Sequence, residues 1–311
     1  MAKKNQVAAH ASRKEESIQK RASSLLTEET PFRITEAYKA ARTNITFALG
    51  ASKGCKRIII TSANPGEGKT TTTINLSIVF AQTDAKVLVI DADLRKPRIY
   101  RHLQLERKNG LSDVLCGFID VDSAIHHCEQ YGIDCITSGQ IPPNPAELLA
   151  SEAMENLLDT LSERYDYIFI DTPPVTIVTE AAVLSKFANG VVIITRQNYT
   201  IHESLTKARE NLLFANAKIL GYILNDISAN RYHYGQYYYR GYSSYSYEYG
   251  YGDSYANAAD RYKYSYDYKY GYQYGKKHEN SSNTSENKSE ESEETYKPTS
   301  FGSLLKKLFK K

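Results

Sequence analysis

The chain has 311 residues, 39 of them basic and 36 acidic, for a formal net charge of +3 at pH 7. So small a charge does not indicate a protein that binds nucleic acid. Its four cysteines form no C-x2-C pair, which predicts reduced thiols and argues against a disulfide or zinc framework. No apolar run approaches the ~20 residues of a membrane-spanning helix, and the polar N-terminus shows no export signal, so we expect a cytoplasmic protein.

Composition divides the chain into four stretches. Residues 1–30 are polar and mixed in charge, which predicts a flexible arm. Residues 31–228 have the apolar content of one globular domain. Residues 229–275 are rich in tyrosine, and residues 276–311 form a polar linker with a short basic amphipathic end. That end could lie on an anionic membrane surface, dock on a partner or fray.

Within the globular stretch, short apolar runs alternate with stretches of helical periodicity. The runs predict buried strands at 57–61, 86–90, 167–170, 191–195 and 219–224. Helices are predicted near 34–50, 70–82, 145–164, 178–187 and 202–215. Strands that are apolar on both faces and alternate with helices indicate an α/β fold with a doubly wound, mainly parallel sheet.

A glycine-rich loop, Ala63-Asn-Pro-Gly-Glu-Gly-Lys-Thr70, joins the first predicted strand to the next helix. This context is typical of a phosphate-binding P-loop, although alanine replaces its first glycine. Gly66 and Gly68 allow backbone amides to face a polyphosphate, Lys69 would reach its phosphates, and the Thr70 hydroxyl would ligate Mg²⁺. The residues predicted to bind the nucleotide are Gly66, Glu67, Gly68, Lys69, Thr70 and Thr71.

Two of the predicted strands end in acids. The second is followed by Asp91 and Asp93, then by Arg95, and the third is followed by Asp171. Residues two apart on a strand face the same way, so Asp91 and Asp93 would share a side at the carboxyl end of the sheet. Such carboxylates favour a role with Mg²⁺ or as a proton acceptor, and Asp171 fits a Walker B acid. Arg95 would pair with the two acids or contact a phosphate.

With these three motifs the chain resembles the bacterial tyrosine kinases, or BY-kinases. That family is marked by a Walker A loop, a Walker A′ motif of the form apolar strand then Asp-x-Asp-x-Arg, and a Walker B motif. The resemblance extends over about residues 31–228, because further family-like sequence occurs at Gly110–Leu115, Ser138–Leu149 and Leu220–Asn225. It implies a P-loop NTPase fold of the ParA/MinD-like deviant Walker class and an ATP- and Mg²⁺-dependent protein-tyrosine autokinase.

The resemblance also implies roles for single residues. Asp91 would accept the tyrosyl proton, although its division of roles with Asp93 stays open. The implied catalytic residues are Lys69, Asp91, Asp93 and Arg95, and the implied metal-binding residues are Thr70, Asp93 and Asp171. The family's oligomerisation motif, Glu-x2-Arg-x2-Arg, stands here as Glu36, Lys39 and Arg42, in which lysine replaces one planar guanidinium.

The resemblance further implies partners and a place in the cell. These are a membrane-embedded activator of the polysaccharide copolymerase type, a cognate tyrosine phosphatase, and other copies of the chain in a ring-like oligomer. The kinase would be cytoplasmic, attached peripherally to the membrane through its activator, and would regulate capsule or exopolysaccharide chain length.

Tyrosine makes up 18 of the 43 residues from Tyr232 to Tyr274. Alternating polar and aromatic residues are equally typical of a segment that associates with itself. The resemblance implies instead that the kinase modifies these hydroxyls, each phosphate adding about −1.5 to −2 charge. The expected phosphoacceptors are Tyr262, Tyr264, Tyr266, Tyr268, Tyr270, Tyr272 and Tyr274.

Two other functions are alternatives to the kinase. A ParA- or MinD-like positioning ATPase would dimerise on ATP and touch a membrane with its basic C-terminal end. Those ATPases carry a signature lysine early in the P-loop, where this chain has Asn64, so the kinase is favoured. An inactive scaffold that binds glycan or partners by tyrosine stacking conflicts with the intact set of P-loop and acidic residues.

Overall fold

The computed structural model describes residues 24–50 and 54–227. Most of the predicted N-terminal arm and both predicted C-terminal stretches lie outside these residues. The predicted domain, 31–228, is described almost completely.

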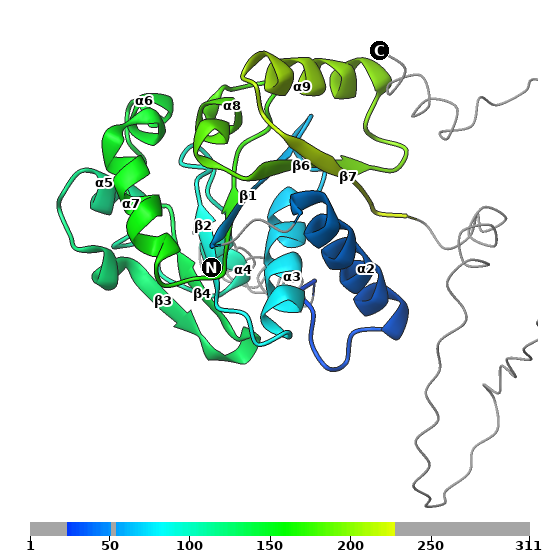
Figure 1. Cartoon of the computed structure of the whole chain (residues 1–311), viewed down its shortest axis with the longest axis horizontal. Coiled ribbons are helices and arrows are strands. Elements are labelled where there is room, and N and C mark those ends of the chain that lie inside the picture. The colour runs from blue at the N-terminus through cyan, green and yellow to red at the C-terminus, as the bar shows by residue number, and fades with distance from the viewer. Residues whose placement is uncertain (1–23, 51–53, 228–311) are drawn as a thin grey trace, which may run out of the picture. The chain divides into compact units, whose positions relative to one another are not determined.

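Seven strands form one sheet in the order β3-β4-β2-β5-β1-β6-β7 (Figure 1). Their bounds are β1 Lys56–Ser62, β2 Val87–Asp91, β3 Ile125–Cys128, β4 Ile133–Ile136, β5 Tyr167–Asp171, β6 Gly190–Arg196 and β7 Ile219–Asn225. Neighbouring strands are parallel except β3 and β4, which pair antiparallel at one edge. The sheet is therefore mainly parallel, as predicted.

Helices cover both faces of this sheet. The α-helices are α2 Phe32–Leu49, α3 Lys69–Ala81, α4 Ile99–His102, α5 Leu111–Leu115, α6 Pro145–Ala150, α7 Glu152–Ser162, α8 Glu180–Leu184 and α9 His202–Phe214, and short 3-10 helices are η1 Val121–Ala124, η2 Glu129–Tyr131 and η3 Ser185–Phe187. Apolar side chains of α2, α3 and α4 form one core, and those of α5 to α9 form a second core on the opposite face (Figure 1). The doubly wound fold is confirmed.

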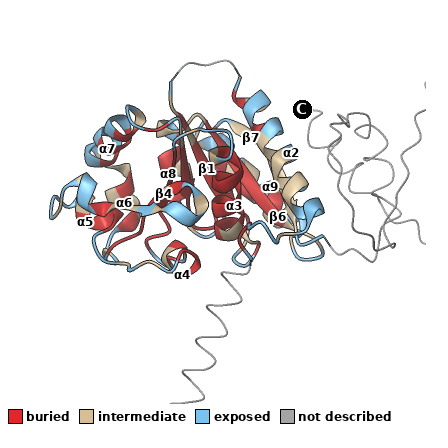
Figure 2. Cartoon of the chain, turned by 90° about the horizontal axis from the view of Figure 1, so that it is seen from below, coloured by how far each residue is buried: buried red, intermediate tan, exposed pale blue. Residues whose placement is uncertain are grey.

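The strands in the centre of the sheet are buried on both faces (Figure 2). Consecutive residues Ile58, Ile59 and Ile60 of β1 are all fully buried, which explains why their run is apolar without alternation. On one face the Phe80 ring of α3 lies 5.1 Å from the Phe169 ring of β5, centroid to centroid. Burying one such side chain stabilises the fold by about 1.5–3 kcal/mol. Among the residues that the structure describes, none of the helices combines the length and hydropathy of a membrane span.

All five predicted strands are confirmed, as β1, β2, β5, β6 and β7. The sequence did not indicate β3 and β4. Each of these has only four residues, and β3 carries two histidines and no fully buried side chain, because it lies at the edge of the sheet. Short, partly exposed strands lack the continuous apolar run that marked the others.

The helix predicted over 145–164 is two helices, α6 and α7. Ser151 separates them with an extended backbone, φ −71° and ψ 159°, and its hydroxyl accepts a hydrogen bond from the Met154 amide as the N-cap of α7. The helix predicted over 178–187 begins at Glu180 and gives way to η3 at Ser185. The helical spacing of apolar residues continues across these helix boundaries, so the spacing could not show where one helix ends and the next begins.

Candidate functional site

The predicted P-loop connects β1 to α3 at the carboxyl end of the sheet. Gly66 and Gly68 have φ angles of +81° and +90°, which side chains rarely tolerate. A Cβ on Gly68 would also lie 2.0 Å from the Asn225 amide nitrogen. Gly68 is the N-cap of α3, so the free amides of the first helical turn open at the loop. Within that turn Thr71 is half-buried.

Glu67 is fully buried and braces the loop from inside. Its carboxylate accepts hydrogen bonds from the Asn64 amide at 2.9 Å and from the Thr200 hydroxyl, and its carbonyl accepts one from the Asn225 side chain at 3.0 Å. Its predicted contact with nucleotide can therefore involve only its backbone in this conformation. Neither Thr200 nor Asn225 was predicted, because both lie more than 130 residues along the chain.

Two residues at the end of β6 and just after it also hold the loop. Arg196 donates to the Gly66 carbonyl at 3.3 Å, and the Tyr199 hydroxyl donates to the Pro65 carbonyl at 3.0 Å. These two residues thus hold the loop through its carbonyls, which leaves the amides at the start of α3 available for an anion.

Lys69 lies at the centre of the acidic site. Its ammonium is 2.9 Å from Asp93 Oδ2 and 3.7 Å from Asp171 Oδ1. The Thr70 hydroxyl donates to Asp171 Oδ2 at 2.6 Å. The structure therefore brings together the predicted lysine, threonine and two of the three predicted acids, all of them buried.

Asp91 occupies a separate position beside this group. It is fully buried and lies opposite Asp171 in the register of β2 and β5. Its oxygens accept hydrogen bonds from the Arg98 and Ile99 amides at 3.2 and 3.1 Å and from the Asp93 amide at 3.3 Å. Asp91 thus faces backbone amides, whereas Asp93 faces the Lys69 ammonium.

Burial governs the protonation of these groups. Loss of water raises the pKa of Asp91 to about 8, and the nearby Asp171 adds to this effect. Burial also raises the pKa of Asp171, against the opposing field of Lys69. For Lys69, burial alone would lower the pKa, but Asp171 and Asp93 outweigh it and hold that pKa above its usual value. Lys69 is therefore a permanent cation at neutral pH.

The donor set suits a magnesium–nucleotide complex. Mg²⁺ prefers hard oxygen ligands and commonly takes only one or two carboxylates together with substrate phosphates. The Thr70 hydroxyl and the Asp171 carboxylate supply such ligands beside the P-loop amides, and Asp93 lies across Lys69 from them. In the described residues, no group of three or more His, Cys, Asp or Glu side chains could hold a metal alone.

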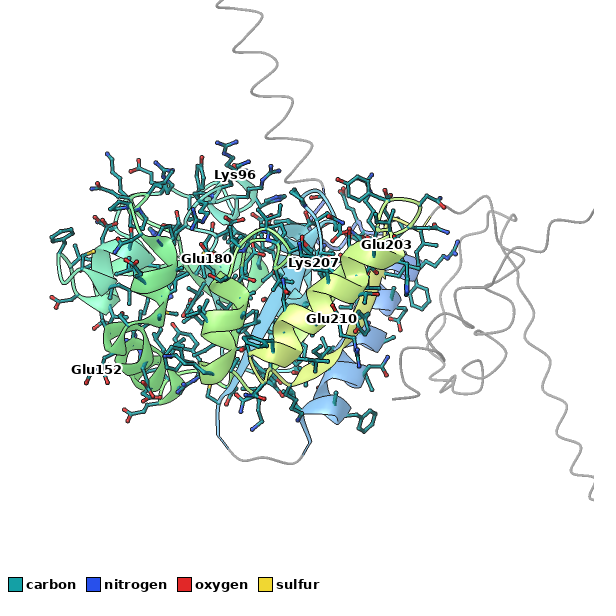
Figure 3. The ribbon with its side chains drawn as sticks, turned by 90° about the horizontal axis from the view of Figure 1, so that it is seen from above. Lys96, Glu152, Glu180, Glu203, Lys207 and Glu210 are labelled. Carbon is teal, nitrogen blue, oxygen red and sulfur yellow. The ribbon has the colours of Figure 1, made fainter. Side chains whose placement is uncertain are left out.

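Arg95 does not pair with Asp91 or Asp93, so that part of its prediction was wrong. Its Nε donates to Glu180 Oε1 at 2.7 Å. Glu180 is 1% exposed, lies at the start of α8 (Figure 3), and has no described partner for its second oxygen. No sequence pattern indicated a role for Glu180, because its buried position follows from the turn after β5.

The predicted oligomerisation residues lie on α2 and make contacts within the chain. Glu36 and Lys39 form an ion pair of 2.9 Å along the helix. Arg42 donates to the Val79 carbonyl of α3 and so fixes α2 against that helix. The expected tyrosine phosphoacceptors, from Tyr262 to Tyr274, lie outside the described residues.

The fold and this constellation define a P-loop nucleotide-binding protein. The AAA domain family AAA_31 matches residues 55–214. The tyrosine-protein kinase YwqD of Bacillus subtilis (strain 168) is 44% identical over 191 residues, which cover 61% of this chain and 80% of that protein. The tyrosine-protein kinase etk of Escherichia coli (strain K12) is 36% identical over 192 residues, covering 62% of this chain but only 26% of the longer protein.

Solved structures agree. The chimerical protein CapA2B2 superposes with a TM-score of 0.63 at 39% identity, covering 66% of this chain and 90% of that one. The kinase domain of the Escherichia coli tyrosine kinase ETK gives a TM-score of 0.61 at 34% identity, covering 70% and 80%. The chain belongs to the AAA_31 domain family and to the bacterial tyrosine-protein kinases.

Proposed function

We propose that the chain transfers the terminal phosphoryl group of ATP to tyrosine hydroxyls, above all those from Tyr262 to Tyr274 of its own sequence. The observation that carries this proposal is the contact of Lys69 with both Asp93 and Asp171 directly beside a P-loop. A cation held by two buried acids can exchange them for phosphates, because all three partners are already desolvated. The kinase relatives support the same reaction.

Each residue of the site has a task in this proposal. The P-loop amides and Lys69 bind the phosphates, and Thr70 and Asp171 hold Mg²⁺. When bound, Mg²⁺ neutralises charge on the phosphate oxygens. With a nucleotide bound, Lys69 would turn from Asp93 toward the phosphates, and Asp93 would then be free to hold the metal or its water.

We assign acceptance of the tyrosyl proton to Asp91. Burial raises the pKa of Asp91 to about 8, so this carboxyl must first lose its own proton to act as a base; once ionised, it takes a proton from a hydroxyl more readily than an ordinary carboxylate does. Both Asp91 oxygens accept backbone amides in this conformation, so the turn from Asp93 to Ile99 must shift when the acceptor tyrosine enters. Proton uptake at Asp91 then accompanies formation of the bond between the tyrosyl oxygen and phosphorus.

The test is purified protein with Mg-ATP, with and without Lys69→Met, followed by mass spectrometry of residues 232–274. Phosphotyrosine that requires Lys69 would support the autokinase. Hydrolysis of ATP without phosphotyrosine, even when a candidate activator fragment is present, would favour the ParA- or MinD-like positioning ATPase.

The wider role also belongs to the proposal. By family resemblance, the kinase regulates capsule or exopolysaccharide chain length with a membrane-embedded activator, and a cognate phosphatase reverses the modification. Peripheral membrane attachment and a ring-like oligomer through Glu36, Lys39 and Arg42 follow from the same resemblance. Native mass spectrometry before and after phosphorylation tests the oligomer: one unchanged mass corresponding to a monomer would contradict it.

A further inference from the structure

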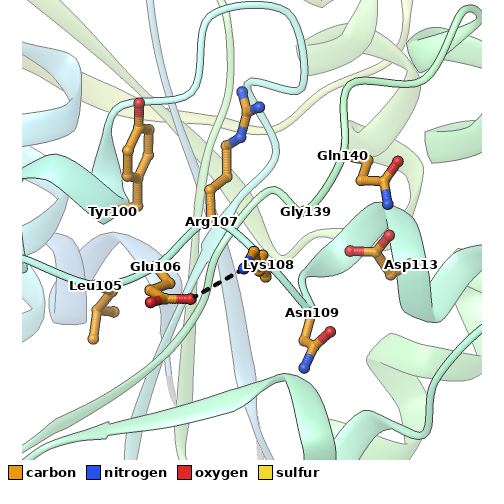
Figure 4. Close-up of a pocket in the computed structure, with 9 residues that line it drawn as sticks. All are labelled: Tyr100, Leu105, Glu106, Arg107, Lys108, Asn109, Asp113, Gly139 and Gln140. Carbon is orange, nitrogen blue, oxygen red and sulfur yellow. Dashed lines mark ion pairs between the residues drawn. The ribbon is translucent and has the colours of Figure 1, made fainter.

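A cavity of about 580 Å³ opens at the carboxyl edge of β2 and β4, and the proposed mechanism makes no use of it. Its lining includes Tyr100, Arg107, Lys108, Asn109 and Gln140 (Figure 4). Ligands of open α/β sheets bind at this edge. The Tyr100 and Arg107 side chains stand side by side, with the guanidinium carbon 6.0 Å from the ring centroid.

The cavity adjoins the catalytic acids through the backbone. Tyr100 lies on α4, directly after Ile99, whose amide donates to Asp91. The amide of Lys96 donates to Asp93 Oδ1 at 3.0 Å, while its side chain is exposed and projects from the domain (Figure 3). The segment that lines the cavity is therefore continuous with the turn that contacts both acids.

The rim of the cavity belongs to a basic segment. Residues 95–108 contain six basic residues against one acid, Glu106; of the six, Arg107 and Lys108 line the cavity itself, beside the carboxylates of Glu106 and Asp113. Arg95 is paired with Glu180 and Lys108 with Glu106. In the part of the chain that the structure describes, the remaining cations have no carboxylate partner; these are Lys96, Arg98, Arg101 and Arg107. Unpaired like charges so close together attract an anionic partner.

The chain itself contains a segment of the matching charge. From Glu286 to Glu294, five of nine residues are glutamate and one is lysine. The expected acceptors themselves are flanked by arginine and lysine, so a basic rim would not attract them unaided. Eleven residues separate Tyr274 from Glu286, a span of at most ~40 Å at about 3.3–3.6 Å per residue. An acidic segment bound at the rim would thus keep tyrosines within reach of the site.

We propose that this cavity and its basic rim bind the segment Glu286–Glu294 of a second copy of the chain and so present that copy's tyrosines to the catalytic acids. The inference rests on the proposed kinase function. Binding through the segment raises the effective concentration of the tyrosines without any added contact at the reacting hydroxyl. It therefore lowers KM more than it changes kcat.

The experiment compares two peptides as substrates, one of residues 258–275 and one of residues 258–294. The enzyme is the full chain with its own five glutamates of the segment changed to glutamine, so that it cannot compete. At low salt we expect the longer peptide to have a KM about fivefold lower, a size consistent with a few exposed ion pairs acting together. The advantage should disappear in Arg107→Gln/Lys108→Gln and survive in the control Lys207→Gln/Lys218→Gln.

A charge exchange sharpens the result. Arg107→Glu/Lys108→Glu should regain the preference for a longer peptide that carries Glu290→Lys and Glu291→Lys. Equal KM values for both peptides with the starting enzyme, or an advantage that persists in Arg107→Gln/Lys108→Gln, would overturn the proposal. Preference for a phosphorylated short peptide over the long one would assign the rim to phosphotyrosine instead.

Binding is measured separately from catalysis. A labelled peptide of residues 276–297 is titrated into the same full chain and followed by fluorescence anisotropy. If neither substrate is phosphorylated but the labelled peptide binds through Arg107 and Lys108, the kinase proposal fails and the binding surface stands. If substrates are phosphorylated but the peptide does not bind, the kinase stands and the surface fails.

Discussion

Replacing Lys69 by methionine should destabilise the folded protein as well as abolish phosphoryl transfer. The ammonium is 2.9 Å from Asp93 and 3.7 Å from Asp171, and neither acid's side chain is more than 7% exposed. Removing one partner of a buried ion pair typically costs about 3–5 kcal/mol, because an uncompensated charge remains. The unpaired carboxylate can avoid that cost by taking up a proton. Protonation costs about 1.4 kcal/mol for each pH unit above the ordinary carboxyl pKa near 3.9, so the loss of stability cannot exceed this amount. For one carboxylate the limit is therefore about 5 kcal/mol at pH 7.5 and about 2 kcal/mol at pH 5.5.

The sign of this pH dependence follows from the acids. The pKa of Lys69 is raised, so its stabilising charge is fully present below its usual value of 10.5 and does not change between pH 5.5 and 7.5. Burial raises the carboxyl pKa of Asp171, and loss of Lys69 removes the main opposing effect. The variant should therefore bind more protons than the parent when folded, and its deficit should grow as pH rises.

The assay is denaturant unfolding at pH 5.5 and 7.5, followed by helical circular dichroism. Lys207→Met, an exposed change on α9, is the control and should alter the unfolding free energy by no more than about 0.5 kcal/mol. Adding Asp93→Asn to Lys69→Met should recover part of the loss. A deficit that is equal at both pH values, or larger at pH 5.5, would refute the reasoning.

Three further changes test other parts of the site. Gly68→Ala places a side chain at φ +90°, 2.0 Å from Asn225. It should weaken nucleotide binding by about 5- to 150-fold, since such strain costs about 1–3 kcal/mol; adding Asn225→Gly should restore only part of the affinity in a nucleotide titration. Glu180→Gln should lower the unfolding free energy by about 1 kcal/mol, because its partner Arg95 is half exposed, and unchanged denaturation midpoints would contradict this. Asp91, with its pKa raised from 3.8 to about 8, holds a proton in the folded state across that range, so stability should fall as pH rises through it and Asp91→Asn should flatten the curve.

The elements that position the site could be predicted from the sequence because they are buried parallel strands. Such strands need apolar side chains on both faces, so β1, β2 and β5 are marked by continuous runs. Their carboxyl ends meet at one edge, which places Asp91 opposite Asp171 without any knowledge of distances. The same geometry brings Lys69 and Thr70, at the start of α3, into contact with Asp171.

Contacts that depend on tertiary structure could not be predicted. The hydrogen bonds that hold the P-loop join Glu67 to Thr200 and Asn225, which are far from Glu67 in the sequence and belong to no motif that includes it. The pairing of Arg95 with Glu180 depends on how the turn after β5 returns to the sheet. The two-residue spacing of Asp91 and Asp93 predicted that both side chains point to the same side of the sheet. The turn that begins after β2 instead gives the two carboxylates different partners. Spacing fixes side-chain direction only while a strand continues.

The residues that hold the P-loop also include the last described residues of the domain. Asn225, the last residue of β7, donates to the Glu67 carbonyl, and the next residue, Asp226, pairs with Arg196, which holds Gly66. The chain therefore departs from the edge of the sheet that carries the nucleotide site. Tyr262 is 36 residues beyond Asp226, which allows roughly 120 Å of extended chain, whereas Tyr232, six residues beyond Asp226, can reach at most about 20 Å. Reach thus favours the later tyrosines as acceptors, in the same copy or a neighbouring one.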